Sequence, residues 1–354
     1  MKLLQKLNKY YKEAYRLGHF PAASSLRSEQ RKFAYYGFLG DENYGDELVF
    51  DATRLIFAPD VLIPVRRTMP LKFAMFTKMS PEKLSGIVVG GGTIVGPSFY
   101  EHEYFLNLAA MGKPIYMHGS GVYKVPRWHE SWKTLLKAPA FGGVRGPHSM
   151  ATFAEYQPQV RVVGDAAFAY FDRSAVRDPG SQSKTVLINL GTHKAFEGIE
   201  NSRAVFGQFL AQLEASGAEI HFLPCHANDL ELAEDLRSRF PAIRVLRVPK
   251  GFAEASGHFR NAAFAIGERL HFVATAIMTG CPFLSINYAD KHADLLASVR
   301  LAQAGVVPAE ATTDKLLAAW EARKSFAWDE AFAALEGYQS VQREQVAAFC
   351  AAGS

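Results

Sequence analysis

The chain has 354 residues, enough for two domains of ordinary size, and its 49% hydrophobic and 21% charged residues are typical of a globular protein with a core. Its net charge of +4 suits anionic small molecules or a membrane surface and is too weak to indicate nucleic-acid binding. Three cysteines without metal-type spacing indicate a reducing compartment and no metal site. No apolar stretch reaches the roughly 20 residues of a spanning helix, so a cytoplasmic location is expected.

Residues 2–17 form the first predicted element, a helix with basic side chains on one side and leucines and tyrosines on the other. Basic amphipathic helices can lie on anionic bilayers, so peripheral contact with the inner face of the membrane is one interpretation. The other is a helix that docks on its own domain with its lysines in water, and it is slightly favoured because nothing else requires a membrane. With the polar linker that follows, the helix makes up residues 1–32.

From residue 33 onward, short apolar strands alternate with amphipathic helices. In the first half, the expected strands are 33–37, 87–89, 114–117, 141–145 and 160–163, and the expected helices are 46–57, 101–111 and 148–156. Polar residues 171–184, rich in Pro, Gly and Ser, mark a domain boundary. In the second half, the expected strands are 185–189, 219–223, 243–248, 263–266 and 283–288, and the expected helices are 202–216, 229–239, 252–261 and 272–278.

This alternation predicts an α/β fold with parallel sheets covered by helices on both faces. Its two halves predict two Rossmann-like domains facing a cleft, at residues 33–175 and 183–326, followed by a C-terminal helix in 327–354. Ligands of parallel sheets bind beyond the carboxyl ends of the strands, so polar residues at strand ends are the candidates for a site.

Two glycine-rich segments follow strands of the first domain. Residues 40–47 (GDENYGDE) allow close approach of a ligand and include Asp46, which can cap the next helix; a well-capped turn is an equal alternative. The segment lacks the Lys-Ser/Thr of a P-loop, and Ala52 stands where an EF-hand needs Glu. Gly90-Gly91-Gly92 lacks the third glycine of a dinucleotide fingerprint, so no NAD or FAD cofactor is expected, although the loop can cradle an anion.

Single polar residues follow other strands. Arg145, with Ser149 one turn later, offers a planar fork for a carboxylate, although a surface ion pair is the usual role of a lone arginine. His226 and Asp229 follow a strand of the second domain. Helix capping explains Asp229, whereas His226 can bond a ligand hydroxyl.

The strongest candidate is Arg269-Leu270-His271, between a strand and a helix, with Lys291 after the next strand, which ends at Tyr288. Cations at a helix N-terminus suit an anion. Two nearby cations lower the pKa of a histidine and a bound dianion raises it again, so His271 can deliver a proton once substrate is present. A buried histidine that only packs is the alternative. No zinc-protease, CxxC or GxSxG motif is present.

Seven segments occur in a fixed order: Asn43-Tyr44-Gly45-Asp46-Glu47, Gly90-Gly91-Gly92, His118 to Gly121, Arg145 with Ser149, Val163-Gly164-Asp165, Leu223 to His226 with Asp229, and Arg269-Leu270-His271 with Gly280-Cys281-Pro282, Tyr288 and Lys291. The series resembles the polysaccharide pyruvyltransferase family over about residues 33–300. The resemblance implies a two-domain glycosyltransferase-B-like fold. It also implies transfer of pyruvate from phosphoenolpyruvate to two hydroxyls of a sugar, giving a cyclic ketal and phosphate, without a cofactor, in bacterial surface or extracellular polysaccharide biosynthesis.

The resemblance also implies roles for the residues. His271 is the general acid, Arg145 and Arg269 hold the carboxylate and phosphate, and Lys291 neutralises the leaving phosphate. The further substrate-binding positions are Leu270, Ser149, Gly91 and Gly92, with Asn43, Asp46, His118 and His226 on the acceptor side. The family often has Gln at position 118, Asp at 146 and Pro at 166, where this chain has His118, Gly146 and Ala166. The first departure can alter acceptor contacts, and the other two change loop shape.

Two other functions stay open at this point. A glycosyltransferase of the same shape would use a nucleotide sugar, and Glu268 could bind its ribose. A non-catalytic scaffold of a polysaccharide assembly complex would keep the fold without turnover, and residues 2–17 are its best support. The acceptor sugar, and whether it is lipid-linked, is not encoded in any motif.

Overall fold

A computed structural model describes residues 18–39, 42–64, 81–97, 102–124, 130–135, 140–154, 156–158, 160–178, 180–190 and 200–352. The helix expected over residues 2–17, and with it the membrane contact, lies outside this part of the chain. The structure divides into two compact units. The first contains Met1–Asp41, Val49–Ala169 and Gly337–Ser354, and the second contains Glu42–Leu48 and Tyr170–Glu336.

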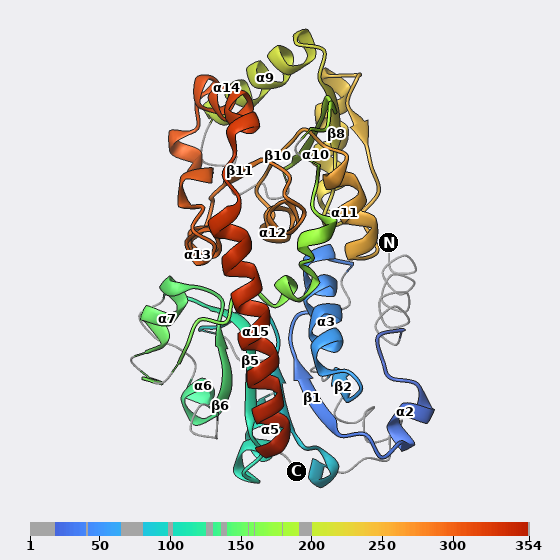
Figure 1. Cartoon of the computed structure of the whole chain (residues 1–354), viewed down its shortest axis with the longest axis vertical. Coiled ribbons are helices and arrows are strands. Elements are labelled where there is room, and N and C mark those ends of the chain that lie inside the picture. The colour runs from blue at the N-terminus through green and yellow to red at the C-terminus, as the bar shows by residue number, and fades with distance from the viewer. Residues whose placement is uncertain are drawn as a thin grey trace, which may run out of the picture. The chain divides into compact units, whose positions relative to one another are not determined.

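The first unit is built on a six-stranded sheet whose paired strands are all parallel (Figure 1). Its strands are β1 (Lys32–Tyr36), β2 (Val61–Pro64), β3 (Gly86–Val89), β4 (Gly92–Val95), β5 (Ile115–Val122) and β6 (Ala140–Val144). The order is β2-β1-β3-β5, and β4 and β6 also pair with β5. Parallel pairing with helical connections is the predicted arrangement.

β3 ends at Val89, just before Gly90-Gly91-Gly92, as expected, but a strand not predicted from the sequence resumes at Gly92. β4 continues β3 in the same register along β5, because Val89 pairs with Met117 and Gly92 with Ser120. A side chain on Gly90 would overlap the hydroxyl of Tyr35, so only glycine fits at this interruption. The strand expected at 114–117 likewise runs on to residue 122, and that expected at 160–163 is reduced to one bridge, between Val144 and Val162.

The two faces of this sheet are covered by different helices. One core joins alternate strand residues such as Ala34 and Ile87 to helices α5 (His102–Ala110), α6 (Glu130–Leu135) and α7 (Pro147–Phe153). The other joins the intervening residues, such as Phe33 and Val88, to helices α3 (Tyr44–Phe57) and α15 (Asp329–Ala352). Burial on both faces explains why the strands read as continuous apolar runs.

The second unit holds another six-stranded parallel sheet, in the order β12-β11-β10-β7-β8-β9. Its strands are β7 (Thr185–Asn189), β8 (Glu219–Phe222), β9 (Arg244–Val245), β10 (Phe264–Gly267), β11 (Phe283–Ile286) and β12 (Gly305–Val306). Three strands agree with the predicted ranges to within a residue or two, whereas the expected strands 243–248 and 283–288 are shorter in the structure. β7 lies between β10 and β8, which places its carboxyl end at the centre of the sheet edge.

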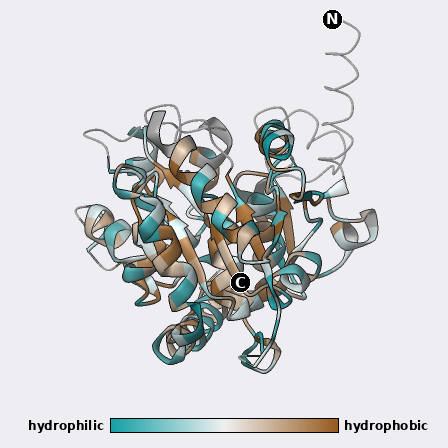
Figure 2. Ribbon diagram, turned by 90° about the horizontal axis from the view of Figure 1, so that it is seen from above, coloured by the Kyte–Doolittle hydropathy of each residue, from teal (hydrophilic) through white to brown (hydrophobic). Residues whose placement is uncertain are grey.

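Helices cover this sheet as well. One core joins the strands to α9 (Glu200–Ala215), α10 (Asp229–Arg239) and α14 (Thr313–Ala322). Outside that core, α11 (Phe252–Arg260) packs on α12 (Leu270–Thr279), and α12 lies against β10 and β11. Figure 2 shows the consequence, with hydrophobic strands inside and hydrophilic faces on the surrounding helices. Both sheets therefore confirm the predicted α/β class.

The remaining short elements connect these layers. They are α2 (Ala23–Arg27), α13 (Asp290–Ser298) and the 3-10 turns Pro81–Lys83, Ala166–Tyr170, Arg173–Ala175, Ala302–Ala304, Pro308–Glu310 and Arg323–Ser325. Within the described ranges, no helix is both long and apolar enough to cross a membrane.

Candidate active site

The carboxyl edge of the second sheet carries the predicted anion site. β10 ends at Gly267, and helix α12 starts at Leu270 with Arg269 as its N-cap residue. No side chain caps this helix, and its first intrahelical bond is the one from Val273 N–H to the Arg269 carbonyl. The N–H groups of the first turn, including that of Leu270, are therefore presented at the sheet edge, where such groups attract anions.

Arg269 is held in place by Asp229 from helix α10. Its Nε lies 3.2 Å from Asp229 Oδ1, and its Nη2 also donates to that oxygen. Asp229 is fully buried, whereas 21% of the Arg269 side chain is exposed. Burial alone would lower the pKa of Arg269, but the hydrogen bond and charge of Asp229 outweigh it and raise the pKa. The pair is thus a fixed cation with its counter-charge behind it.

Asp229 was expected to cap α10, but it is the first residue of that helix, and the N-cap residue is Asn228. Asp229 Oδ2 accepts the backbone N–H of Cys225 at 2.9 Å and that of His226 at 3.2 Å. The carboxylate therefore shapes the loop before α10 as well as orienting Arg269. The same loop orients the His226 ring, whose Nδ1 accepts the N–H of Asn228 at 3.0 Å. In the neutral ring the proton is then on Nε2, which makes His226 a hydrogen-bond donor.

Asn189, the last residue of β7, belongs to this site and was not singled out from the sequence. Its Oδ1 accepts the backbone N–H of Arg269 at 3.2 Å. Its Nδ2 donates to the Leu223 carbonyl at 2.8 Å and lies 3.4 Å from Asp229 Oδ2. The one available signal was a polar residue ending a buried apolar strand.

His271 lies in the first turn of α12 and is 8% exposed. The backbone of Gly45 packs against its ring, since a Cβ at residue 45 would lie 2.9 Å from His271 Cγ. Thr275 Oγ1 donates its proton to the His271 carbonyl at 2.6 Å. The Tyr44 hydroxyl, which lies 2.8 Å from Thr275 Oγ1, must therefore be the donor in their hydrogen bond. Burial raises the pKa of Tyr44, which keeps this hydroxyl protonated.

These contacts explain why residues 42–48 group with the second unit, although the sequence placed them in the N-terminal domain. The Tyr44 N–H also donates to the Cys225 carbonyl at 2.8 Å. Asn43 Oδ1 accepts the Gly45 N–H at 3.0 Å, so Asn43 rather than Asp46 makes the bond that opens the helix. Asp46 lies in the first turn of α3. Asn43 and Asp46 thus stand a residue or two from Gly45, which packs against His271.

Lys291 adds a second cation at the same edge. Its Nζ lies 4.8 Å from the centroid of the Tyr288 ring, in a cation–π contact. The next helix position, His292, is fully buried, and its Nε2 lies 2.7 Å from the Glu268 carbonyl. Tyr288 and His292 are themselves in ring contact, 4.9 Å between centroids. The segment from β11 to α13 is thereby tied to the residue that precedes Arg269.

Arg145 lies in the first unit and is also paired with a carboxylate. Only 1% of its side chain is exposed, and Nη1 lies 4.0 Å from Asp165 Oδ2. Its Nη2 is 3.4 Å from Thr93 Oγ1, and Gly121 leaves the space for it, since a Cβ there would lie 2.5 Å away. Gln342 of α15 supports the pair by donating to the Asp165 carbonyl at 3.1 Å. The alternative interpretation of Arg145, a surface ion pair, is therefore wrong, because the pair is buried.

The other predicted positions of the first unit are buried supports. Ser149 Oγ accepts the Val122 N–H at 3.1 Å. Gly91 is packed under Val49, and Gly92 has φ +88, a left-handed conformation that favours glycine. His118 is fully buried, and its Nδ1 lies 2.9 Å from Thr53 Oγ1. In this unit, the structure brings Arg145 together with Thr93 of β4 and Gly121 of β5, and it buries His118 away from solvent.

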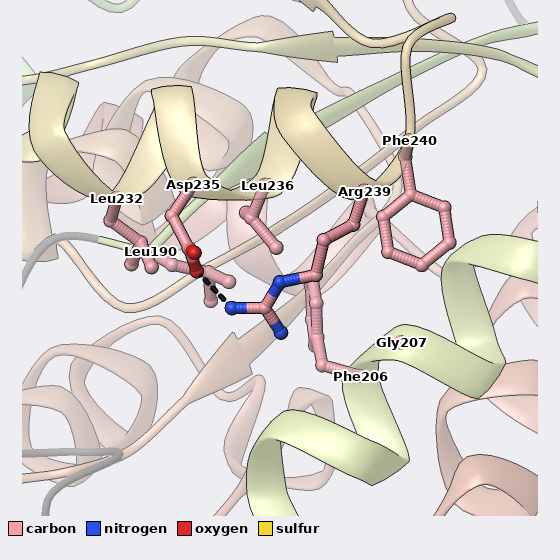
Figure 3. A pocket seen from close by; sticks show the side chains of 8 residues that line it. All are labelled: Leu190, Phe206, Gly207, Leu232, Asp235, Leu236, Arg239 and Phe240. Carbon is pink, nitrogen blue, oxygen red and sulfur yellow. Dashed lines mark hydrogen bonds and ion pairs between the residues drawn. The ribbon is translucent and has the colours of Figure 1, made fainter.

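A hollow of about 370 Å³ between α9 and α10 is a separate feature of the second unit (Figure 3). Its lining is mainly apolar, and its arginine, Arg239, is paired with Asp235 of the same helix. Among the described residues that line it, none is a predicted site residue. It offers no unpaired cation to an anionic substrate. Nor does any group of three or more His, Cys, Asp or Glu within the described ranges have the arrangement of a metal site.

Known structures share the fold of this chain at low sequence identity. The UDP-GlcNAc 2-epimerase of Methanocaldococcus jannaschii, in complex with UDP-GlcNAc and UDP, is 12% identical, with a TM-score of 0.54 over 85% of this chain and 94% of that one. The putative UDP-N-acetylglucosamine 2-epimerase of Listeria monocytogenes is 11% identical, with a TM-score of 0.56 over 90% and 91%. These similarities show a glycosyltransferase-B-type fold.

No curated protein matches the sequence. The sequence model of polysaccharide pyruvyl transferases, however, matches residues 43–290. That span runs from Asn43 to Asp290 and includes Arg145, Asp229, Arg269 and His271. Because it covers most of the chain and both Arg–Asp pairs, the chain belongs to the polysaccharide pyruvyl transferase family.

Proposed function

We propose that the protein transfers pyruvate from phosphoenolpyruvate to two hydroxyls of a saccharide, forming a cyclic ketal and releasing phosphate. The setting is bacterial surface or extracellular polysaccharide biosynthesis in the cytoplasm. The observation that carries the proposal is Arg269, fixed by Asp229, next to His271 at the uncapped start of α12. An anion-binding cation and a proton donor thus share one helix terminus.

The proposed reaction has two steps. His271 protonates the methylene carbon of the enol, the central carbon gains oxocarbenium character, and the first sugar hydroxyl bonds to that carbon. The proton released by this hydroxyl returns to the His271 ring. The second hydroxyl then bonds to the same carbon while the bond between this carbon and the bridging phosphate oxygen breaks. The proton of the second hydroxyl leaves with the phosphate. No oxidant, reductant or cofactor is needed.

The donor side is supported by the charges at the α12 edge. Arg269 supplies directional N–H groups, and Asp229 cancels its net charge. Lys291 and the helix terminus, where Leu270 contributes its backbone N–H, add further positive potential for a phosphate. His226, a donor through Nε2 when neutral, is proposed to bond a hydroxyl of the acceptor next to this site.

The acceptor side is supported by the contact between Gly45 and His271, which brings Asn43 and Asp46 near the proton donor. We propose that these two side chains hold the sugar hydroxyls. Arg145, Ser149, Gly91, Gly92 and His118 stay predicted contributors from the first unit. Phosphate release from phosphoenolpyruvate by Arg145→Ala tests that role for Arg145.

The nucleotide-sugar alternative requires an acidic residue that is open to a ribose. Glu268 is fully buried, and its carbonyl is engaged by His292, so it is poorly suited to that task. The structurally similar Methanocaldococcus jannaschii epimerase does bind UDP-GlcNAc, which makes UDP-sugars a necessary comparison. Thermal-shift measurements with phosphoenolpyruvate, UDP-sugars and GDP-sugars distinguish the two functions, because only the true donor raises the Tm at micromolar concentrations.

The decisive experiment measures phosphate release from phosphoenolpyruvate in the presence of diol-bearing oligosaccharides, with the ketal identified by mass spectrometry. The His271→Ala variant is expected to lose activity roughly 10²–10⁴-fold. His258→Ala, which removes a half-buried histidine from α11, is the matched control and should retain activity. Normal turnover by His271→Ala, or no turnover by the wild type with any diol acceptor, would overturn the proposal.

A further inference from the structure

Asn189 occupies a unique position at the edge of the second sheet. It is the last residue of β7, and β7 lies between β8 and β10. Its neighbours in register are residues at the ends of those two strands, since Ile188 pairs with Phe222 and Asn189 with Gly267. A side chain here can therefore reach the loops after both neighbouring strands at once.

The side-chain amide of Asn189 forms hydrogen bonds with both loops. Toward the α12 side, Oδ1 accepts the N–H of Arg269, while the main-chain carbonyl of Asn189 accepts the N–H of Glu268 at 3.1 Å. Toward the α10 side, Nδ2 donates to the Leu223 carbonyl and lies near Asp229 Oδ2. A flipped amide would set oxygen against these two oxygens, so the network determines the orientation.

Both halves of the Arg269–Asp229 pair are thus bonded to one buried side chain. Asn189 fixes the backbone of Arg269 where α12 begins, and it also contacts the carboxylate that orients the guanidinium. Asn189 is fully buried, so no solvent competes for these bonds. Without it, Asp229 would still pair with Arg269, but the pair would not be anchored to the sheet.

We propose that Asn189 is a positioning residue for the donor anion, and that it sets where Arg269 meets the phosphate or carboxylate of phosphoenolpyruvate. This inference rests on the proposed function. Asn189 does not touch the reacting atoms. It acts through Arg269, and its effect falls on donor binding rather than on the acceptor.

The inference is tested with Asn189→Ala and Asn189→Asp in the full-length protein. Asn189→Ala is expected to raise the KM for phosphoenolpyruvate by roughly 10–10²-fold, because a misplaced Arg269 weakens charge-assisted hydrogen bonds to the anion, with an unchanged KM for the acceptor. Asn261→Ala is the matched control. Its amide only bonds the Gly257 carbonyl at the end of α11, so both KM values should stay at wild-type levels.

Asn189→Asp supplies a readout that loss of stability cannot mimic. The new carboxylate keeps the acceptor for the Arg269 N–H but faces the Leu223 carbonyl and the Asp229 carboxylate. Its repulsion from Asp229 is relieved on protonation, which also restores a donor. The KM of this variant for phosphoenolpyruvate should therefore fall toward the wild-type value as the pH is lowered, whereas that of Asn189→Ala should not.

The outcomes separate the two proposals. If the wild type neither binds phosphoenolpyruvate nor releases phosphate from it, the proposed function fails. If the wild type is active and the Asn189 variants lose kcat without a change in either KM, or change both KM values equally, the role of Asn189 in donor positioning is refuted. A selective rise in the donor KM, reversed by acid only in Asn189→Asp, supports it.

Discussion

The ring of His271 occupies the space that a side chain at Gly45 would need, because a Cβ there would lie 2.9 Å from Cγ and closer still to Nδ1. Gly45→Ala should therefore displace the ring and lower kcat about 10²-fold. Since Gly45 lies in helix α3, alanine should gain up to about 1 kcal/mol in helix propensity. This gain offsets the cost of moving the ring, so the Tm should change little. Steady-state kinetics and thermal unfolding measure both effects.

The control for this substitution is Gly257→Ala in α11, where a Cβ would meet open space. It should be fully active. In the His271→Ala background, Gly45→Ala should have almost no further effect, because the ring it displaces is gone. Additive losses in the double variant would show that Gly45 acts on something other than His271.

Removal of the charge on Asp229 should affect both stability and donor binding. Asp229→Asn removes the negative charge that balances Arg269. The amide also keeps only one acceptor oxygen for Arg269 and the N–H groups of Cys225 and His226. A broken buried pair costs about 3–5 kcal/mol, and the partial exposure of Arg269 reduces this to roughly 2 kcal/mol. The KM for phosphoenolpyruvate should rise at the same time. Urea unfolding and kinetics provide the measurements.

Asp235→Asn is the comparison, because Asp235 pairs with Arg239 on the same helix but at the surface. That exposed pair should contribute no more than about 0.5 kcal/mol, and its loss should leave the kinetics unchanged. Equal destabilisation by the two substitutions would contradict the importance given to the Asp229 network.

Acid should destabilise the first unit through His118, whose pKa burial lowers to about 4. Between this value and the unfolded pKa of about 6.5, the unfolded state binds more protons, so the free energy of unfolding falls as the pH drops through that window. The contribution of this group is roughly 3 kcal/mol. His118→Asn, whose amide can replace Nδ1–H as donor to Thr53, should flatten the dependence between pH 6.5 and 4. An identical pH dependence in wild type and variant would exclude His118 as its source.

Lys291 should matter for donor affinity and not for folding. Lys291→Met removes a partly exposed cation, so the KM for phosphoenolpyruvate should rise about tenfold with an unchanged Tm. Added salt should raise the KM of the wild type more than that of the variant, since screening acts on the missing charge. Lys315→Met, at an exposed pair with Glu310, is the control for general charge effects. A variant with the wild-type salt dependence would rule out a role for Lys291.

The sequence was sufficient for the fold class and for most elements because apolar strands and amphipathic helices leave local patterns. It was also sufficient to place Arg269 and His271 at the start of a helix. It could not show that β3 resumes as β4 after Gly91, because glycines mark turns and interrupted strands alike. The contact of Tyr44 with Thr275 is equally invisible, since the two residues are far apart in the chain.

The polar residues that support the two arginines were not predicted for a similar reason. Asp229 has the sequence of an ordinary capping residue, and only the packed structure shows it bonded to Arg269. Asn189 ends a buried strand, and its amide finds its partners through sheet order rather than spacing. The sequence also could not show that Arg145, predicted to bind substrate, is buried, because that burial depends on its pairing with Asp165, which lies on a separate segment of the chain.

Gln342, in the C-terminal helix, supports the position of Arg145, one of the predicted substrate-binding residues. This α15 side chain donates to the carbonyls of Val163 and Asp165, and Asp165 faces Arg145. Gln342→Ala should therefore remove the support of the Asp165 carbonyl, while the core residues of α15, such as Phe349, keep the first unit folded. Arg145 should then lose its alignment although the circular-dichroism spectrum is unchanged, so variants of this helix should be tested for activity as well as for yield.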